Sequence, residues 1–598
     1  MDTILTRIRN AVRLFGQAFS GYTPQFIVII AVGFFASLLE GLGISAIVPI
    51  FSFVTGGGGV AGDPITAAIM RLFELIGVPY TFRALLLFVG VLFIVRIIAM
   101  FAIQNITARI VFGYARAMRE RILRSTLEAR WPFLSMQKVG HLDQLLSTNT
   151  VNVSQFFGIF STVVMICAKT VAYVLIALNI SPVVALLSLV VGGVLFFGLK
   201  PLFGRNKAYS TEAETLNRTL AHFASQHVVG MKTVKALGAE GPALRAAGGY
   251  FERVKSINIR MVQLRGFLEM TIQFAGLAFV AGVFVSMYYS GSFNFAAFGV
   301  IVYAINQIFT QIQAAQVQIH SISMMLPYLT FTQNYIQSAE KELEIEEGKR
   351  HAGIGKSIRF DRVSFSYPGR AGTLQDISFE IKRGGMLAIV GPSGAGKSTI
   401  ADLLLRFVEH TGGAIEVDGT DIRELALAEW RKSIGYVTQD SFLLNDTIRN
   451  NISFYDTSFT DEDISRAARA ANIHDFIAGL PHGYDAVVGD RGVLISGGER
   501  QRIALARVLV RKPTLLILDE ATSSLDAGSK RAIHASLLAL RGTTTIVVIA
   551  HSDPIVLKAD TLLVLQGGTI VEAAAPDKVS STTRALLSRS YSEETEDV

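Results

Sequence analysis

The residues with the clearest chemical potential lie in the stretch GPSGAGKST, directly after the apolar run MLAIV. Gly391, Gly396, Lys397 and Ser398 follow the spacing G-x-x-x-x-G-K-S, and the apolar stretch IADLLLRF that comes next is typical of a helix. Glycines let backbone amides wrap around phosphates, the lysine reaches the β and γ oxygens, and the serine hydroxyl can ligate magnesium. The stretch therefore predicts a site for ATP and Mg²⁺. Its expected contact residues are Gly391, Ser393, Gly394, Gly396, Lys397, Ser398 and Thr399.

Two acids follow a second apolar run, TLLIL, in the stretch TLLILDEATSSLD. We expect Asp519 to hold the magnesium ion through its water shell and Glu520 to polarise the water that attacks the γ-phosphate. A third predicted strand, TTIVVIAH, ends at His551, which is placed to touch the γ-phosphate. Three strands of one type thus end in groups suited to ATP hydrolysis.

A second arrangement suited to binding an anion lies in GVLISGGERQR. Ser496, Gly497 and Gly498 precede a predicted helix, so the hydroxyl and the glycine amides can approach a phosphate at the helix start. The chain therefore carries two phosphate-binding stretches about a hundred residues apart.

The order of these motifs resembles that of the ATP-binding cassette transporters, and the resemblance covers nearly the whole chain. It implies that Tyr367 in FSYPG stacks on adenine, and that Gln439 in GYVTQD senses magnesium and the attacking water. It also implies that Asp526 in SSLD lies in a loop crossing between two cassettes. ISGGERQR resembles the family's signature sequence, with Ile495 and Glu499 where leucine and glutamine are most frequent.

In this family the signature contacts the nucleotide held by the other cassette. Since the chain has one phosphate loop and one signature, the resemblance implies a two-fold homodimer with two ATP molecules sandwiched head to tail. A heterodimer with a second gene product is an open alternative.

The first half of the chain is too apolar for a soluble protein. The composition is 51% hydrophobic with a mean hydropathy of +0.43, and most of the apolar excess precedes residue 325. A bilayer core of about 30 Å needs roughly 20 apolar helical residues. The stretches that qualify are 25–54, 82–106, 157–179, 181–203, 266–290 and 294–322.

The charges of the loops set the expected orientation. Basic residues gather before the first span and in the two long loops after the second and fourth spans, which places both termini and the ATPase domain in the cytoplasm. This distribution accounts for the net charge of +7 without nucleic acid as a partner. The expected location is the plasma membrane, the inner membrane of a bacterium, and the helical pattern of the long loops predicts that the spanning helices continue into the cytoplasm.

The expected fold class is a membrane α-helical domain of exporter type, with six transmembrane helices, fused to an α/β P-loop ATPase domain. The predicted boundaries are an interfacial amphipathic helix over 1–24, a transmembrane domain over 25–322, a linker helix over 323–354, a nucleotide-binding domain over 355–585 and an acidic tail over 586–598.

Polar groups within the spans mark a candidate substrate cavity, because ionisable groups in a bilayer usually face a cavity or one another. The candidates are Glu40, Arg96, Asn306 and Gln307. The stretch LLEGLGISAIVPI resembles the first span of bacterial half-transporters that flip lipid-linked oligosaccharides, which implies a lipid-linked glycan or a similar amphipathic lipid as substrate. An arginine facing the cavity would suit a pyrophosphate or another anionic head group.

Other functions compatible with the sequence are a multidrug or peptide exporter, an importer on the exporter fold, and an ATP-gated channel or regulatory subunit. The intact catalytic residues argue against the last of these.

Overall fold

The computed structural model describes most of the chain. The described residues are 12–16, 18–46, 49–50, 53, 64–137, 141–180, 182–289, 295–344, 348, 353–369, 372–438, 441–489, 494–521, 527–550, 553–580 and 583. The chain forms two compact units, one of residues 1–127 and 138–341 and one of residues 128–137 and 342–598. Half of the predicted amphipathic helix, residues 1–11 and 17, and the whole acidic tail lie outside the described residues.

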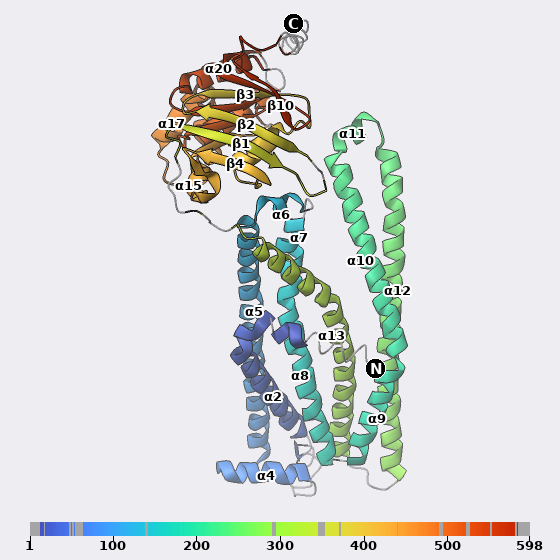
Figure 1. Ribbon diagram of the computed structural model, residues 1–598. Helices are drawn as coiled ribbons and strands as arrows, with labels where there is room; N and C mark the ends of the chain where they lie inside the picture. The colour runs from blue at the N-terminus through green and yellow to red at the C-terminus, as the bar shows by residue number, and fades with distance from the viewer. Residues whose placement is uncertain are drawn as a thin grey trace. The chain divides into compact units, whose positions relative to one another are not determined.

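The first unit is helical throughout its described part (Figure 1). Its helices are η1 (Ser20–Tyr22), α2 (Thr23–Ser45), α4 (Pro64–Ile76), α5 (Phe82–Leu127), α7 (His141–Gln144), η2 (Leu145–Asn149), α8 (Thr150–Ile180), α9 (Pro182–Gly198), α10 (Lys200–Val229), α11 (Met231–Ala236), α12 (Glu240–Tyr289) and α13 (Phe295–Lys341).

The six expected spans fall on α2, α5, α8, α9, α12 and α13. Among the described residues, the segments 20–45, 82–127, 142–175 and 240–289 are long and apolar enough to cross a membrane. Helix α9 is apolar but shorter, while α13 carries amide side chains such as Asn306, Gln307 and Gln311 that lower its hydropathy.

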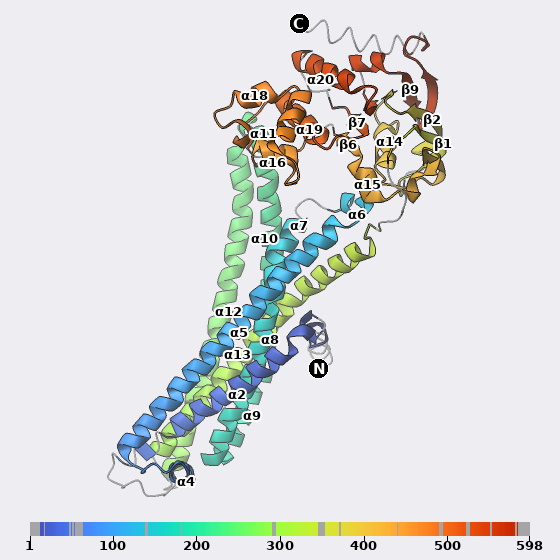
Figure 2. The same cartoon turned by 90° about the vertical axis from the view of Figure 1, so that its left-hand side faces the viewer.

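Several helices are far longer than a bilayer is thick. Helix α5 has 46 residues, which at about 1.5 Å per residue is roughly twice the length needed to cross the hydrocarbon core. Helices α10 and α12 run side by side as a hairpin with α11 at its tip (Figures 1 and 2). The helices therefore continue beyond the spans, as the pattern of the long loops predicts. Helix α13 passes residue 322 without a break and ends at Lys341, so the predicted start of the linker helix lies inside one continuous helix.

The second unit contains two sheets. The antiparallel sheet has the order β2 (Leu374–Lys382), β1 (Ser357–Phe365), β4 (Gly412–Val417), β5 (Thr420–Asp421). The six-stranded sheet has the order β10 (Thr569–Ala574), β9 (Thr561–Gln566), β3 (Met386–Val390), β8 (Thr545–Ile549), β7 (Leu515–Asp519), β6 (Ile434–Val437). All neighbours in the second sheet pair in parallel except β10 with β9. Strands β3, β7 and β8 are buried along their whole length, which explains their uninterrupted apolar sequences.

The helices of this unit surround the parallel sheet (Figure 2). They are α14 (Lys397–Leu404), η3 (Ile422–Glu424), α15 (Leu427–Lys432), α16 (Ile448–Ser453), α17 (Asp461–Ala470), α18 (His474–Ala478), η4 (Gly483–Asp485), α19 (Gly497–Leu509), α20 (Ala527–Leu540) and η6 (Pro554–Lys558). One apolar core joins β1, β2 and β4 to α14, and a second joins the other face of the parallel sheet to α16–α19.

The tip of the first long loop belongs to the second unit. It contains α6 (Trp131–Ser135). The ring of Trp131 stacks on that of Phe407, with the ring centroids 5.4 Å apart. Ala129 forms an antiparallel bridge with Leu343, and the guanidinium of Arg431 lies 5.1 Å from the centre of the Phe407 ring. The tip is thus held by a short strand pairing and by aromatic packing.

Candidate functional site

The chemical groups of the ATPase unit gather at the carboxyl edge of the parallel sheet. Strand β3 leads into the phosphate loop, and β7 ends at Asp519. Strands β6 and β8 end two residues before Gln439 and His551. Ligands of parallel α/β sheets bind outside this edge, where the loops leave the strands. Gln439, Asp526 and His551 lie outside the described residues, so their roles stay predictions.

The phosphate loop requires glycine at two described positions. Gly396 caps α14 with φ 99°, and a Cβ atom there would lie 2.6 Å from Cδ2 of Leu374. A Cβ atom on Gly391 would lie 2.2 Å from the carbonyl oxygen of Leu565. No side chain fits either position, so the backbone can lie close to a ligand at the amino end of α14.

Lys397 lies along this loop rather than in solvent. The residue is only 6% exposed, and its Nζ donates to the carbonyl oxygens of Gly391 at 2.8 Å and Pro392 at 3.1 Å. Ser393, Gly394 and Ser398 are exposed on the same loop, while Thr399 is buried. A cation, a helix start and exposed hydroxyl groups on a glycine loop form a cradle that fits a polyphosphate.

Two of the three donors expected for magnesium, Ser398 and Asp519, lie together. Asp519 is buried, and this burial raises the pKa of its carboxyl, while a hydrogen bond from Ser398 opposes the rise. Tyr436 on β6 also donates to Asp519, from its hydroxyl to Oδ2 at 3.4 Å. A carboxylate beside a hydroxyl is a donor set that fits Mg²⁺, which when bound would neutralise charge on the phosphates. Tyr436 was not among the predicted site residues, since only strand pairing brings it beside Asp519.

Glu520 leaves the end of β7 in a conformation that few non-glycine residues adopt. Its φ is 49°, and its N–H donates to the carbonyl oxygen of Ile549 at 2.9 Å. Such backbone costs on the order of 1–3 kcal/mol and is found most often at functional sites. The conformation is held by the pairing to β8, which fixes Glu520 at the sheet edge beside Asp519.

The signature serine begins α19 and forms a capping box with Glu499. Ser496 Oγ accepts from the Glu499 N–H at 3.4 Å, and the Ser496 N–H donates to Oε2 of Glu499 at 2.7 Å. The glycines that follow occupy the first turn, so their amides point out of the helix start. The acid at position 499 therefore supports the helix start of the signature.

Arg507 attaches the other end of α19 to the segment that follows β6. It donates from Nε to the carbonyl of Asn451 at 2.7 Å, from Nη1 to the carbonyl of Phe442 at 2.7 Å and from Nη2 to Oδ1 of Asn451 at 2.9 Å. Burial lowers the pKa of Arg507 to about 10. Asn451 is fully buried, and its side chain donates to the carbonyl of Leu444.

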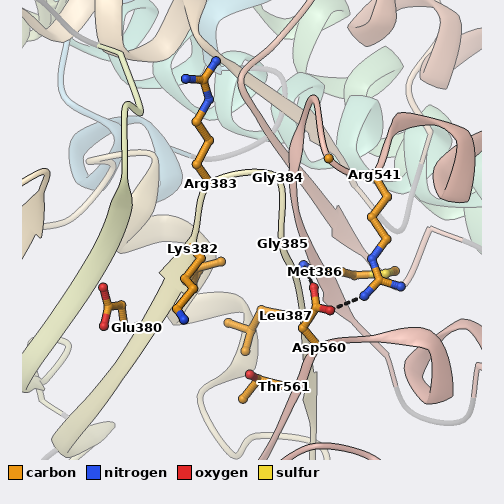
Figure 3. A pocket seen from close by; sticks show the side chains of 12 residues that line it. Glu380, Lys382, Arg383, Gly384, Gly385, Met386, Leu387, Arg541, Asp560 and Thr561 are labelled. Atoms are coloured by element: carbon orange, nitrogen blue, oxygen red, sulfur yellow. Dashed lines mark hydrogen bonds and ion pairs between the residues drawn. The ribbon is translucent and has the colours of Figure 1, made fainter.

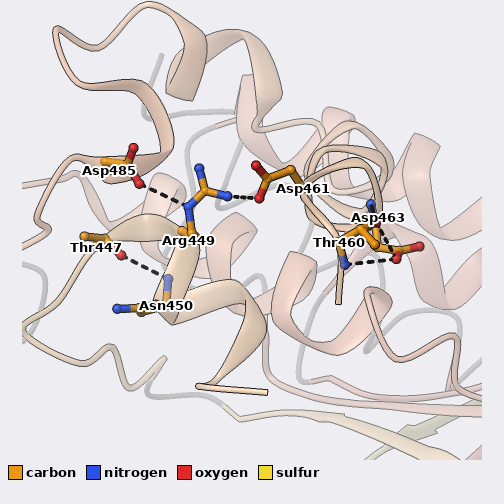
Figure 4. A network of polar contacts seen from close by, with 7 residues as sticks. All are labelled: Thr447, Arg449, Asn450, Thr460, Asp461, Asp463 and Asp485. Atoms are coloured by element: carbon orange, nitrogen blue, oxygen red, sulfur yellow. Dashed lines mark hydrogen bonds and ion pairs between the residues drawn. The ribbon is translucent and has the colours of Figure 1, made fainter. Parts of the chain in front are cut away.

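A network of charged and polar residues joins α16, η4 and the start of α17 (Figure 4). Arg449 pairs with both Asp461 and Asp485. Thr447 caps α16, and Thr460 forms a capping box with Asp463 at the start of α17. The signature helix α19 therefore packs against two helices, α16 and α17, whose first backbone N–H groups are hydrogen-bonded by their own capping residues.

A separate groove lies at the amino ends of β3 and β9 (Figure 3). Arg541 pairs with Asp560, which also accepts a hydrogen bond from the N–H of Met386 at 2.7 Å. This edge of the sheet is opposite the phosphate loop, so the groove is distinct from the nucleotide site.

Three of the four candidate cavity residues meet within the membrane unit. Arg96 on α5 lies 2.8 Å from Oε2 of Glu40 on α2. The hydroxyl of Tyr303 on α13 donates to Oε1 of Glu40 at 3.0 Å and accepts from Nε2 of Gln307 at 2.8 Å. We call Glu40, Arg96, Tyr303 and Gln307 the polar cluster.

The polar cluster differs from the prediction in two residues. Tyr303, one helical turn before Gln307, was missed because a tyrosine in an apolar span gives no signal of its own. Asn306 is exposed, and no described side chain joins it to the cluster. The side chain of Glu40 is 7% exposed and that of Arg96 27%, so the arginine is the more accessible partner.

The comparisons with known proteins match both halves of the chain. Residues 28–315 match the family described as ABC transporter transmembrane region, and residues 374–523 match the family described as ABC transporter. A solved structure of a bacterial Atm1-family ABC exporter with ATP bound superposes with a TM-score of 0.74 at 24% identity, covering 96% of this chain and 98% of that one. The expected fold class is thereby confirmed.

Two curated relatives align across the membrane and ATPase halves. The ATP-dependent lipid A-core flippase of Sodalis glossinidius (strain morsitans) is 33% identical over 472 residues, 78% of this chain and 80% of that protein. The heterocyst differentiation ATP-binding protein HepA of Nostoc sp. (strain PCC 7120 / SAG 25.82 / UTEX 2576) is 31% identical over 467 residues, 77% and 76% of the two chains.

Another relative has a higher identity over a shorter region. ATP-binding cassette sub-family B member 6 of Mus musculus is 46% identical over 232 residues, which are 39% of this chain and 27% of that protein. The alignment thus spans about a quarter of that relative's length. Taken together, the long apolar helices and these matches show that the chain belongs to the ABC transporter family, with the transmembrane region and the ABC domain of an exporter half-transporter.

Proposed function

We propose that two copies of this chain form a homodimer that moves a lipid-linked glycan or a similar amphipathic lipid from the cytoplasmic side of the membrane outward. The main support is the lipid A-core flippase match, because it covers 78% of this chain and so includes the half that must recognise the substrate. Matches limited to the ATPase half carry no information on the substrate.

The proposed catalytic unit is a composite of two chains. The phosphate loop of one chain holds ATP with Tyr367 on the base, and Ser496, Gly497 and Gly498 of the other chain face the γ-phosphate. Ser398, Gln439 and Asp519 hold magnesium, and Asp526 lies where the two cassettes meet.

Hydrolysis then follows from the groups at the sheet edge. Glu520 polarises a water molecule whose oxygen attacks the γ-phosphorus, and the bond from this phosphorus to the bridging oxygen of ADP breaks. His551 contacts the γ-phosphate as charge shifts onto the leaving group. ATP binds the closed dimer better than the open one, and this difference drives the conformational change.

The polar cluster is the proposed contact for the polar head of the substrate. Arg96 and Glu40 together carry no net charge, while the phenol and amide of Tyr303 and Gln307 offer hydrogen bonds suited to sugar hydroxyls. An anionic head group, such as a pyrophosphate, would have to displace Glu40 from Arg96. We place the protein in the bacterial inner membrane with both termini and the ATPase unit in the cytoplasm.

Mass spectrometry of lipids that co-purify with the nucleotide-free protein tests this proposal. We expect enrichment of a polyprenyl-linked glycan or a glycolipid over a membrane-extract control, and loss of that enrichment in Arg96→Ala. Bulk phospholipid alone, in both proteins, would contradict the lipid-flippase function and favour a multidrug or peptide exporter.

A further inference from the structure

Tyr367 is held by two contacts of different kinds. It follows β1 in the turn at 366–369, and its ring meets that of Phe365 edge-on, with centroids 4.8 Å apart and planes at 86°. Its hydroxyl donates to Oδ2 of Asp402 at 3.0 Å. A tyrosine side chain turns about two bonds, so an edge contact at the ring and a hydrogen bond at its tip restrict both.

Asp402 comes from the helix that carries the phosphate loop. It lies three residues after Thr399 on α14, so the two side chains share one helix face. The first turn of α14 thus faces the phosphates, while the second contacts the aromatic residue assigned to the base.

The carboxylate of Asp402 lies where a negative charge is unfavourable, so its presence there has to be explained. It is half-buried, and burial raises the pKa of its carboxyl. A negative charge near the phosphate loop also disfavours a polyphosphate.

We propose that Asp402 is a positioning residue that fixes the ring of Tyr367 for stacking on the nucleotide base. The inference rests on the proposed role of Tyr367 and adds to it a residue outside the nucleotide motifs. Because the ring is ordered before ATP arrives, ATP binding does not lose the conformational entropy that ordering the ring would cost. Removing the carboxylate should therefore weaken recognition of the base and leave the phosphate contacts and the hydrolytic step intact.

The test separates base recognition from phosphate recognition in the full-length protein. ATPase activity gives kcat and the KM for ATP, and inhibition by inorganic tripolyphosphate gives a Ki for a ligand without a base. The variants are Asp402→Ala, Asp402→Asn, Tyr367→Phe, Tyr367→Ala and the double variant Asp402→Ala with Tyr367→Phe. Glu409→Ala, an exposed acid after the same helix, is the matched control.

We expect Asp402→Ala to raise the KM for ATP about 5-fold, as for loss of one hydrogen bond of ordinary strength. The kcat and the tripolyphosphate Ki should stay unchanged. Tyr367→Phe should give the same rise and the double variant no more, because both remove one interaction. Asp402→Asn keeps an acceptor oxygen and should stay close to wild type.

Four outcomes would overturn the inference. Equal changes in the ATP KM and the tripolyphosphate Ki would show that Asp402 acts through the phosphate loop. Additive effects in the double variant would show that Asp402 and Tyr367 act separately. An unchanged KM in Tyr367→Ala would refute the stacking role of Tyr367 itself and the positioning role with it, whereas a raised KM there with no effect of Asp402→Ala would refute the positioning role alone.

Discussion

At the scale of single residues, Glu499 and Glu520 show how position decides the use of a carboxylate. Glu499 accepts a hydrogen bond from the N–H of Ser496 and so completes the cap of α19. Glu520 instead follows a buried strand in a left-handed conformation, with its backbone tied to β8. The first acid stabilises a helix start, whereas for the second, at the sheet edge, we propose a catalytic role.

Glu520→Gln should abolish turnover while ATP binding persists. The amide keeps the shape of the side chain but is a far poorer acceptor for the proton of the attacking water, so we expect a loss of about 10²- to 10⁴-fold in kcat. Steady-state phosphate release and nucleotide retention measure the two properties. Glu409→Gln should be indistinguishable from wild type, and normal hydrolysis in Glu520→Gln would refute the assigned role.

At the scale of elements, polar side chains fix how neighbouring helices are positioned along one another. Contacts between apolar faces alone would not fix that position. Arg507 connects the signature helix to the segment after β6, and the polar cluster connects α2, α5 and α13. Since each contact satisfies buried polar groups, breaking it leaves those groups without partners.

Arg507→Ala should destabilise the ATPase unit by about 2–4 kcal/mol, because two carbonyls and one amide lose their donor. The expected readout is a fall of the thermal unfolding midpoint of the purified protein by roughly 5–10 °C. Arg507→Lys should be intermediate, since one ammonium group cannot reproduce the planar fork. The exposed Arg511→Ala is the control, and equal midpoints for both alanine variants would contradict the role of Arg507.

Glu40→Ala should destabilise the membrane unit by about 3–5 kcal/mol, because Arg96 keeps its charge without a partner. The double variant Glu40→Gln with Arg96→Gln should recover much of this loss. The exposed pair Arg265–Glu269 on α12, 3.0 Å apart, gives the matched control, for which Glu269→Ala should cost less than about 1 kcal/mol. Thermal unfolding in detergent compares them, and a double variant as unstable as Glu40→Ala would refute the pairing argument.

At the scale of the whole molecule, we propose that the single phosphate loop and the single signature of each chain are completed by those of a partner chain. Two chains related by a two-fold axis would supply both sites equally. The same arrangement makes each site depend on two different chains, which mixed dimers can reveal.

A dimer of one Ser496→Arg chain and one Lys397→Ala chain should keep one intact site if the signature acts across the interface. A dimer of wild type with a chain carrying both substitutions should keep none. Nucleotide trapped with vanadate per purified mixed dimer measures the number of intact sites. The reverse result would show that each chain completes its own site.

Much of the nucleotide site follows from local sequence. The spacing of Gly391, Gly396 and Lys397 and the two acids after TLLIL predict their places, because strand, turn and helix start are each set by a few adjacent residues. The spans and their helical extensions follow in the same way from the length of apolar runs and from helical periodicity.

The tertiary structure alone decides which distant side chains meet. The pairing of Arg96 with Glu40, the hydrogen bond from Tyr436 to Asp519 and that from Tyr367 to Asp402 each join different elements. The union of residues 128–137 with the ATPase unit is likewise decided there. Local propensity sets where an element begins and which face is apolar, but the packing of elements sets which polar groups lose water together and must satisfy one another.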